Sequence, residues 1–332
     1  MEKIRFATVG TSWITDEFIG ALKTFPQAEL KGVYSRNEEK AHAFAQKHGA
    51  GLAFTSLEEM AKSKEIDAVY IASPNSCHCE QSLLFLNSKK HVICEKPAAS
   101  NLKEVQMMTA AARDNGVTFM EAYKSIFMPG MKAVKENLHK LGTIRSAFFS
   151  FAKYSSRYDA HKEGKNVNTF KAEFSNGALM DLGMYCVAPM LHLFGTPSAI
   201  SSFAAKVEGG VDGAGALIMG YPTFVATLNY GKVADSHLPC EIAGEEATML
   251  IHHISIPDKT EIIYRDKTKD NEVIIPDQRP DNMCYEIEEF LTCIKEGRPE
   301  SAIHTHAITE ACMEIMDEAR RQGNIIYPAD SK

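Results

Sequence analysis

Residues 3–15 read KIRFATVGTSWIT, in which a strand-like run meets a helix-like segment at Gly10. We expect a strand over 3–9 and a helix over 13–24 from the spacing of their apolar residues. A glycine at this junction lets the chain turn tightly and bring amide groups against a pyrophosphate at the N-terminus of the helix. This order of strand, glycine turn and helix predicts a dinucleotide-binding fold.

The turn itself supplies the first candidate cofactor residues. These are Gly10, Thr11, Ser12, Trp13 and Ile14. Ser12 and Thr15 stand where the usual fingerprint has its second and third glycines, so the motif on its own is degenerate. A plain strand-to-helix turn is the alternative explanation, but the elements on either side favour nucleotide binding.

Strand-like and helix-like segments alternate from residue 1 to about 124. The predicted strands are 3–9, 29–34, 52–54, 68–72, 91–94 and 118–122. The predicted helices are 13–24, 38–48, a segment opened by the capping pattern at Ser56, 80–87 and 102–115. This alternation predicts βαβ units around a parallel sheet. We therefore expect an α/β Rossmann domain, a doubly wound parallel sheet that binds a dinucleotide, over 1–124.

The rest of the chain, 125–332, has a different rhythm. Strand candidates separated by turn residues lie at 144–153, 200–207, 214–219, 224–230, 241–244, 249–251, 261–265 and 272–275. Helices are expected at 130–141, 179–194, 283–295 and 307–322. Runs of strands with few crossover helices predict an α+β domain on a mostly antiparallel open sheet. We expect this domain to bind substrate and to form oligomers.

The composition is that of an ordinary soluble protein. The chain has 332 residues, of which 45% are hydrophobic and 24% charged, and its formal net charge is -7. This charge argues against nucleic acid or an anionic membrane as the main partner. We expect no signal peptide, because 3–9 already reads as a strand, and no membrane span. The eight cysteines lie mostly in apolar or helical segments, which favours reduced thiols and a cytoplasmic protein.

The end of the second predicted strand bears on the choice of cofactor. A ribose 2′-hydroxyl is usually held by an Asp or Glu about 20 residues beyond the glycine turn. Here the strand ends at Ser35 and Arg36, with no carboxylate before Glu38. A hydroxyl next to a guanidinium suits a 2′-phosphate, so we expect NADP(H), with NAD(H) as the second choice. An exposed loop arginine is the alternative explanation.

Two segments carry a resemblance to a known family. Residues 71–78 read IASPNSCH and residues 92–97 read VICEKP. At this spacing they resemble the glucose–fructose oxidoreductase/inositol dehydrogenase (Gfo/Idh/MocA) family, and the resemblance extends over the whole chain. It implies that Lys96 lies beside the nicotinamide and the reacting oxygen of the substrate, with Glu95 close to the cofactor. It also implies a cofactor-lining role for Ala72, Ser73, Pro74, Asn75 and His78.

Lys96 also has a favourable position from the residues alone. It would lie at the carboxyl end of a parallel strand, where doubly wound sheets bind their ligands, and Pro97 would fix the backbone after it. Partial burial and a positively charged nicotinamide both disfavour the ammonium form, which suits acid–base work near neutral pH. A surface lysine in a helix-entry loop is the alternative.

A second candidate catalytic segment is 177–185, GALMDLGMY. Asp181 and Tyr185 are four residues apart on a predicted helix, so their side chains share one face. Tyr185 could donate a proton to a carbonyl, and Asp181 could orient Lys96 or bind a substrate hydroxyl. A carboxylate favoured by the helix dipole and a half-buried core tyrosine are the alternative explanations.

This segment departs from the pattern of the inositol-dehydrogenase-like members of the family. They have histidine at the position of Tyr185 and aspartate at that of Ala188. The departure argues against a histidine proton relay and against an inositol-type substrate. A tyrosine here is more similar to the branch of the family that holds dimeric dihydrodiol dehydrogenase and NADP-linked D-xylose dehydrogenase.

Other polar clusters carry less information. Arg157 and Tyr158 follow a predicted strand and are candidate substrate contacts, although a polar strand edge explains them equally well. The histidines at 252–253 and 304–306 are not paired with a second cluster at zinc-finger spacing, so we expect no metal.

The sequence as a whole predicts an NADP-dependent oxidoreductase. We expect hydride transfer between nicotinamide and a hydroxyl-bearing carbon of a sugar, polyol or diol, in a homodimer or homotetramer. One rival is a non-catalytic NADP-sensing regulator with the same fold. Another is an enzyme that uses the nicotinamide transiently for elimination or glycoside cleavage.

Overall fold

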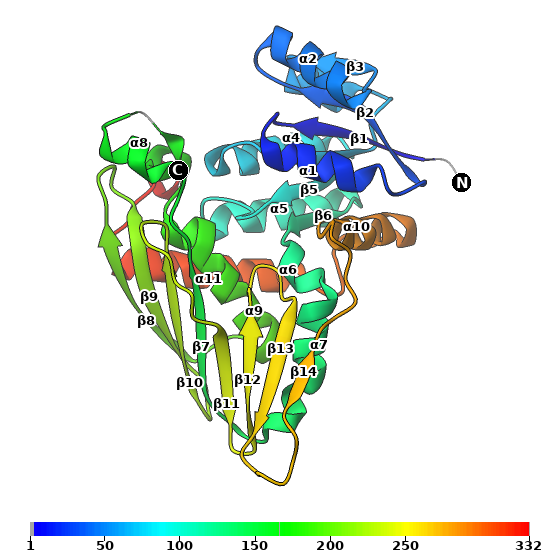
Figure 1. Ribbon diagram of the computed structural model, residues 1–332. Helices are drawn as coiled ribbons and strands as arrows, with labels where there is room; N and C mark the ends of the chain where they lie inside the picture. The colour runs from blue at the N-terminus through cyan, green and yellow to red at the C-terminus, as the bar shows by residue number, and fades with distance from the viewer. Residues whose placement is uncertain (1–2, 166, 332) are drawn as a thin grey trace. The chain divides into compact units, whose positions relative to one another are not determined.

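A computed structural model describes residues 3–165 and 167–331 (Figure 1). The chain folds into two compact units. The first unit comprises the residues up to Lys124 together with Arg279–Thr309, and the second comprises Ser125–Gln278 and the residues from Glu310 onward. The chain therefore leaves the first unit and later returns to it. The expected division into 1–124 and 125–332 assigns the returning segment to the second part. The assignment of a separate function to each part remains a prediction.

The first unit contains a six-stranded sheet in which every pair of neighbours is parallel. Its strands, in spatial order, are β3 (Leu52–Phe54), β2 (Ala28–Tyr34), β1 (Ile4–Val9), β4 (Ala68–Ile71), β5 (His91–Glu95) and β6 (Phe119–Ala122). The strand order reverses between β1 and β4, and doubly wound sheets bind their ligands at the carboxyl ends of the strands flanking such a reversal. The predicted Rossmann architecture is confirmed.

Helices of the first unit follow its strands. They are α1 (Trp13–Leu22), α2 (Glu38–His48), α3 (Leu57–Lys62), α4 (His78–Asn87), α5 (Leu102–Asn115) and α10 (Cys284–Glu296), with a short 3-10 turn at Asn75–Cys77. Polar side chains cap several of them: Ser56 accepts a hydrogen bond from the backbone N–H of Glu59, as the sequence pattern predicts. Helix α10 comes from the returning segment and packs on the sheet, where Phe290 contacts Phe6 edge to face.

The second unit contains an eight-stranded sheet. Its strands, in spatial order, are β14 (Glu272–Ile274), β13 (Lys259–Tyr264), β12 (Ala247–His252), β11 (Cys240–Gly244), β7 (Ile144–Ala152), β10 (Val225–Gly231), β9 (Asp212–Gly220) and β8 (Ala199–Lys206). The β7–β10 pair is parallel and the other pairs are antiparallel. The prediction of a mostly antiparallel sheet is confirmed.

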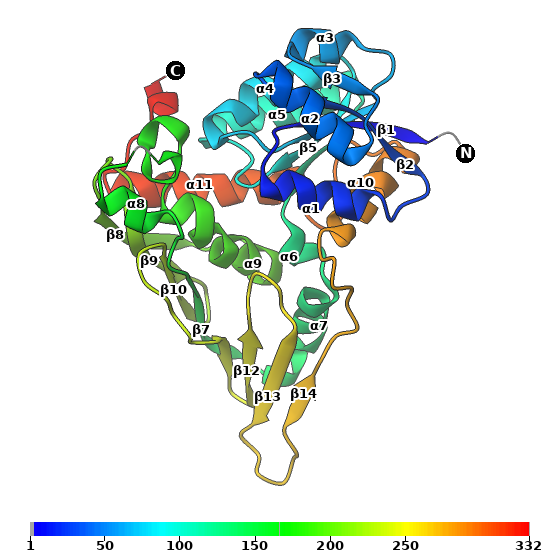
Figure 2. The same cartoon turned by 45° about the horizontal axis from the view of Figure 1, so that its top comes forward.

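One face of this sheet is covered by helices. Helix α9 (Met184–Phe194) packs on β7 and β10, and α7 (Pro129–Asn137) packs on β13 (Figures 1 and 2). The other helices that lie wholly or partly in the second unit are α6 (Lys124–Phe127), α8 (Tyr158–Lys162) and α11 (His306–Gln322). The opposite face exposes apolar side chains from three neighbouring strands: Phe203 on β8, Ile218 on β9 and Val225 on β10. Such a face is suited to contact with another chain.

The helix predicted over 179–194 is not uniform. Residues Leu179–Gly183 form a turn of π-helix, and α9 follows directly. Turns of π-helix are rare in proteins, and those that occur often lie at functional sites. The longer stretch Ala172–Phe194 is apolar enough to cross a membrane by length and composition alone, but 67% of its most apolar window is buried inside the protein. A core helix passes the same test.

The first prediction concerns the glycine turn. Gly10 has φ +114°, and a Cβ at this position would lie 2.6 Å from the carbonyl oxygen of Ala72. Gly10→Ala is therefore expected to lower the free energy of unfolding by about 1–3 kcal/mol, measured by urea unfolding.

Gly20, on the helix α1 that follows the turn, serves as the control. A Cβ at this position would have no atom of the described residues within 4 Å, and the φ of Gly20 is not in the positive range. Gly20→Ala is expected to leave stability unchanged or to raise it by up to about 1 kcal/mol. Equal stability of the two variants would contradict the packing argument.

Candidate active site

The glycine turn lies at the carboxyl end of β1, where the strand order reverses. The backbone N–H of Ala72 donates to the carbonyl oxygen of Val9 at 2.8 Å, so the loops after β1 and β4 are in contact. Ser12 precedes α1 with no hydrogen bond from its side chain to the helix, and the Trp13 side chain is 72% exposed. The start of α1 is thus accessible at Ser12 and Trp13, and its N–H groups and dipole can bind a pyrophosphate.

Ser35 and Arg36 follow β2 at the same edge of the sheet. The backbone N–H of Ser35 donates to the carbonyl oxygen of Phe54, and the Ser35 hydroxyl accepts from the N–H of Asn37. Arg36 is exposed, and its positive charge partly offsets the burial that raises the pKa of Tyr34. The pair thus presents a hydroxyl and a guanidinium, the groups that bind a phosphate monoester.

His78 links the loops after β4 and β5. Its Nε2 lies 2.9 Å from the carbonyl oxygen of Ser73, and its Nδ1 lies 2.9 Å from that of Pro97. The side chain is 1% exposed, and burial lowers its pKa against the effect of the two carbonyls. A neutral imidazole donates one hydrogen bond, so it satisfies one carbonyl fully. From its buried position, His78 therefore supports the loop that contains Ser73, Pro74 and Asn75.

Lys96 lies directly after β5, as predicted, and is half-buried. Its backbone N–H donates to Glu95 Oε2 at 3.2 Å, and the peptide bond to Pro97 is cis. Glu95 Oε1 accepts from the hydroxyl of the buried Tyr70 at 2.6 Å. Burial raises the pKa of Glu95, while the Tyr70 hydrogen bond and the charge of Lys96 lower it.

Sequence analysis missed the acid that lies near Glu95. Glu286 on α10 is 1% exposed, and neither of its carboxyl oxygens has a hydrogen-bond partner among the residues that the structure describes. Burial raises its pKa well above the ordinary value, the charge of Glu95 raises it further, and Lys124 opposes the shift. Glu286 comes from the returning segment, and no local pattern connects it with β5.

In the second unit, Asp181 lies on the π-helical turn. Its Oδ2 is 2.6 Å from the Nζ of Lys232, which is 3% exposed, whereas the Asp181 side chain is 39% exposed. The Lys232 ammonium also lies 5.3 Å from the centre of the Phe170 ring, a cation–π distance. Sequence analysis did not single out Lys232, because a lysine just after a strand gives no signal of burial.

Asp212 holds the start of the same turn. Its Oδ2 accepts from the backbone N–H of Leu179 at 2.7 Å, and the side chain is fully buried. Burial raises the pKa of Asp212 to about 6, against the lowering effects of backbone hydrogen bonds and of the Lys232 charge. Its buried carboxyl replaces a conventional N-cap side chain.

Tyr185 follows the π-helical turn and is half-buried. Its ring meets that of Phe151 on β7 edge to face, with centroids 5.2 Å apart. Asp181 lies four residues earlier, in the π-helical turn, and both side chains are partly accessible. The structure thus leaves both groups able to reach a ligand.

The candidate substrate residues lie near Lys232. Tyr158 begins α8, and its ring lies 5.4 Å from that of Phe170. The preceding Ser155 donates its backbone N–H to the carbonyl oxygen of Lys232 at 2.8 Å. Arg157 is exposed on the same loop. The second unit therefore gathers Tyr158, Phe170, Lys232 and Asp181 in one region.

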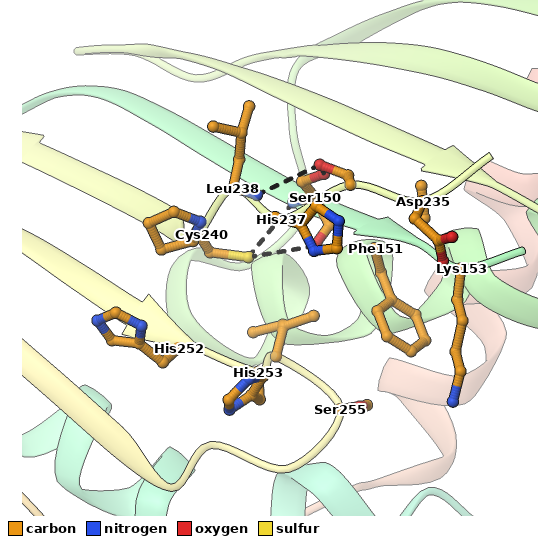
Figure 3. A pocket seen from close by; sticks show the side chains of 14 residues that line it. Ser150, Phe151, Lys153, Asp235, His237, Leu238, Cys240, His252, His253 and Ser255 are labelled. Atoms are coloured by element: carbon orange, nitrogen blue, oxygen red, sulfur yellow. Dashed lines mark hydrogen bonds between the residues drawn. The ribbon is translucent and has the colours of Figure 1, made fainter.

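A cavity of about 330 Å³ lies wholly within the second unit (Figure 3). It is lined by the end of β7, by residues 235–240 and by residues 252–255. Phe151, which contacts Tyr185, forms part of its wall, and Lys153, Asp235 and His237 supply polar groups. Its size and polar lining suit a small hydroxylated molecule.

The histidines that resemble metal ligands have other partners. His252 contacts Glu261 at 3.0 Å, His253 contacts Asp258 at 3.0 Å, and His304 contacts the buried Glu121 at 2.9 Å. Within 3–165 and 167–331, no group of three His, Cys, Asp or Glu side chains is arranged to hold a metal ion. All eight cysteines lie in these ranges, and none forms a disulfide there.

Comparison with known proteins places both parts of the chain in one group. Residues 4–123 match the sequence profile GFO_IDH_MocA, described as an oxidoreductase family with an NAD-binding Rossmann fold. Residues 133–250 match the GFO/IDH/MocA C-terminal domain. The two matches together span more than half of the chain.

Relatives match over almost their full length. Scyllo-inositol 2-dehydrogenase (NADP(+)) IolU of Bacillus subtilis is 48% identical over 327 residues, which cover 98% of this chain and 99% of the relative. Trans-1,2-dihydrobenzene-1,2-diol dehydrogenase of Danio rerio is 33% identical over 345 residues, 99% of each chain. The structure of KijD10, a 3-ketoreductase from Actinomadura kijaniata, with NADP and TDP-benzene has the same fold. Its TM-score is 0.86 at 20% identity, with 97% of this chain and 98% of that chain covered.

The second prediction concerns Asp212 and pH. Between its ordinary pKa of 3.8 and about 6, the folded protein keeps a proton that the unfolded chain has released. The free energy of unfolding therefore falls as pH rises through this window. Asparagine does not titrate in this range. As the pH rises from about 4 to about 7, the free energy of unfolding of Asp212→Asn is therefore expected to rise by roughly 1–3 kcal/mol relative to that of the parent.

Urea unfolding across this pH range measures the difference. Asp270→Asn, at an exposed position, is the control and should track the parent protein. A pH-independent difference between Asp212→Asn and the parent would show that the pKa of Asp212 is the same in the folded and unfolded protein.

Proposed function

Because this chain belongs to the Gfo/Idh/MocA oxidoreductase family, we propose that it transfers a hydride between NADP(H) and a hydroxyl-bearing carbon of a polyol, sugar or diol. The observation that carries the proposal is the position of Lys96. It follows β5 at the same edge of the sheet where Gly10 follows β1 and Arg36 lies just beyond β2. In the oxidative direction the C–H bond breaks as hydride leaves, the hydroxyl proton is released, and a carbonyl forms.

NADP(H) is the preferred cofactor, and NAD(H) is the weaker one. Ser35 and Arg36 offer a hydroxyl and a cation where NAD-specific folds have a carboxylate. The relative that is 48% identical is named as NADP(+)-dependent. The accessible start of α1, the loop from Ala72 to Asn75, and Glu95 with Pro97 form the rest of the proposed cofactor site, and His78 supports it.

Three side chains divide the chemistry. Bound nicotinamide supplies the hydride donor or acceptor at its C4. Lys96 acts as the main acid–base group at the reacting oxygen, and Tyr185 donates a proton to the carbonyl or polarises it. Asp181 holds a substrate hydroxyl as an acceptor. Arg157 and Tyr158 contact the part of the substrate remote from the reacting carbon.

A cyclic polyol leads the list of substrates. The residues Tyr185 and Ala188 argue against an inositol-type substrate, but a relative 48% identical over its full length is named for scyllo-inositol. The departure at these two positions therefore does not exclude an inositol. Tyr185 takes the place of the histidine in the proposed proton transfer.

We further propose a homodimer or homotetramer in the cytoplasm. The exposed apolar face formed by Phe203, Ile218 and Val225 supports pairing of subunits through the second unit, the part of the chain assigned to substrate binding and oligomerisation. The net charge of -7 argues against nucleic acid as a partner.

The third prediction tests the catalytic roles. Lys96→Ala is expected to lower kcat by about 10²–10⁴-fold and Tyr185→Phe by about 10-fold or more, because each removes a proton donor or acceptor. NADPH oxidation or NADP⁺ reduction is followed by absorbance with a panel of inositols, aldoses, diols and dicarbonyls.

Binding of NADPH, measured by fluorescence titration, must persist in both variants. Lys62→Ala, at an exposed position on α3, is the control and should retain full activity. Tight NADPH binding without turnover of any compound would favour the regulator instead. A non-oxidised product formed with no net change in NADPH would favour elimination or glycoside cleavage.

The fourth prediction concerns cofactor choice. Arg36→Ala is expected to raise the Kd of NADPH by roughly 10- to 100-fold, because it removes charge-assisted hydrogen bonds to the 2′-phosphate. The Kd of NADH should change little. The assignment of Arg36 fails if the two dinucleotides weaken equally or neither changes.

A further inference from the structure

We propose that Lys232 is the positioning residue for Asp181: its buried ammonium fixes the carboxylate on the π-helical turn in one orientation toward the substrate hydroxyl. The inference rests on the proposed function, in which Asp181 accepts a hydrogen bond from substrate. It adds a residue that no sequence pattern marks and that need not touch the substrate itself.

The burial of the two partners is unequal, and this determines which one depends on the other. Lys232 is 3% exposed, whereas the side chain of Asp181 is 39% exposed, at a separation of 2.6 Å. A buried ammonium is costly unless a carboxylate neutralises it. Because Asp181 is partly exposed, water can solvate its carboxylate without Lys232, so the protein does not need the lysine to neutralise Asp181. The lysine instead restricts where the carboxylate can lie.

Both the backbone and the side-chain end of Lys232 are held in place. The backbone N–H of Lys232 donates to the carbonyl oxygen of Gly213 at 2.7 Å, and its carbonyl oxygen accepts from the N–H of Ser155 at 2.8 Å. These bonds fix the residue between β9 and the loop after β7. The ring of Phe170 lies 5.3 Å from Nζ and closes a further side. A lysine side chain is ordinarily flexible, but this one is held at both ends.

The turn that carries Asp181 packs on β10, the strand that ends directly before Lys232. A Cβ on Gly183 would lie 3.0 Å from the ring of Tyr230, so the π-helical turn packs closely against β10 two residues before Lys232. Asp212 caps the other end of the turn through Leu179 and lies within electrostatic range of Lys232. Strand β10 thus positions both the turn and the cation that restrains its carboxylate.

The arrangement also connects Asp181 with the proposed substrate loop. Tyr158 packs on Phe170, whose ring is near the Lys232 ammonium, and Ser155 is hydrogen bonded to the Lys232 backbone. A change at Lys232 therefore disturbs the orientation of a substrate-binding carboxylate before it affects the nucleotide. The expected signature is a change in substrate KM and kcat/KM with no change in the Kd of NADPH.

The fifth prediction tests this signature. Lys232→Met, which keeps the length and packing of the side chain, is expected to raise KM and lower kcat/KM by roughly 10- to 100-fold. Lys232→Arg should recover a large part of the loss, because a guanidinium can still pair with Asp181. NADPH titration and circular dichroism confirm that each variant is folded. Lys140→Met removes an ion pair of the same length, 2.6 Å to Glu272 near the β14 edge of the sheet, and should keep kcat/KM within about twofold.

A double-mutant cycle with Asp181→Asn distinguishes the possible failures. If Lys232 acts through Asp181, Lys232→Met costs almost nothing more in the Asp181→Asn background. Additive losses, or a Lys232→Met protein as active as the parent, overturn the inference while leaving the role of Asp181 intact. Full activity of Asp181→Asn overturns both. Indifference to Lys96→Ala refutes the proposed function itself.

Discussion

The backbone at Gly10 passes so close to the carbonyl oxygen of Ala72 that no side chain fits between them. This approach holds the turn after β1 against the turn after β4, where the strand order of the parallel sheet reverses. The exposed N-terminus of α1 and the loop that leads to His78 keep their places relative to one another through this contact. The proposed nucleotide site depends on it, because both segments must face the same ligand.

Each unit buries ionisable side chains next to its candidate catalytic groups. In the first unit, Lys96 follows Glu95, which accepts a hydrogen bond from Tyr70 and lies near the buried Glu286. In the second unit, Asp181 is paired with Lys232, and Asp212 caps the same turn. Buried ionisable groups are costly, so their presence near partly exposed Lys96 and Asp181 is better explained by positioning and electrostatics than by stability.

The comparisons establish the family and its oxidoreductase chemistry, and we propose that the second unit selects the substrate. The fold is shared with a 3-ketoreductase at 20% identity, and the sequence is close to dehydrogenases named for an inositol and for a dihydrodiol. What differs among such proteins must lie in the groups around the hydroxylated ligand. The candidates here are Tyr185, the cavity-lining Phe151 and the loop that holds Tyr158, which are the groups we propose to face the substrate.

The amino-acid sequence by itself determined the alternating strands and helices of 1–124, the glycine turn and the location of Lys96 at a strand end, because these depend on local periodicity and on residue types with few backbone options. It also placed Asp181 four residues before Tyr185. Only the tertiary structure decided that Arg279–Thr309 returns to the first unit and brings Glu286 near Glu95, and that Lys232 is buried against Asp181. These pairings join residues far apart in the chain, and burial of a charged side chain depends on its neighbours in space, which no local pattern encodes.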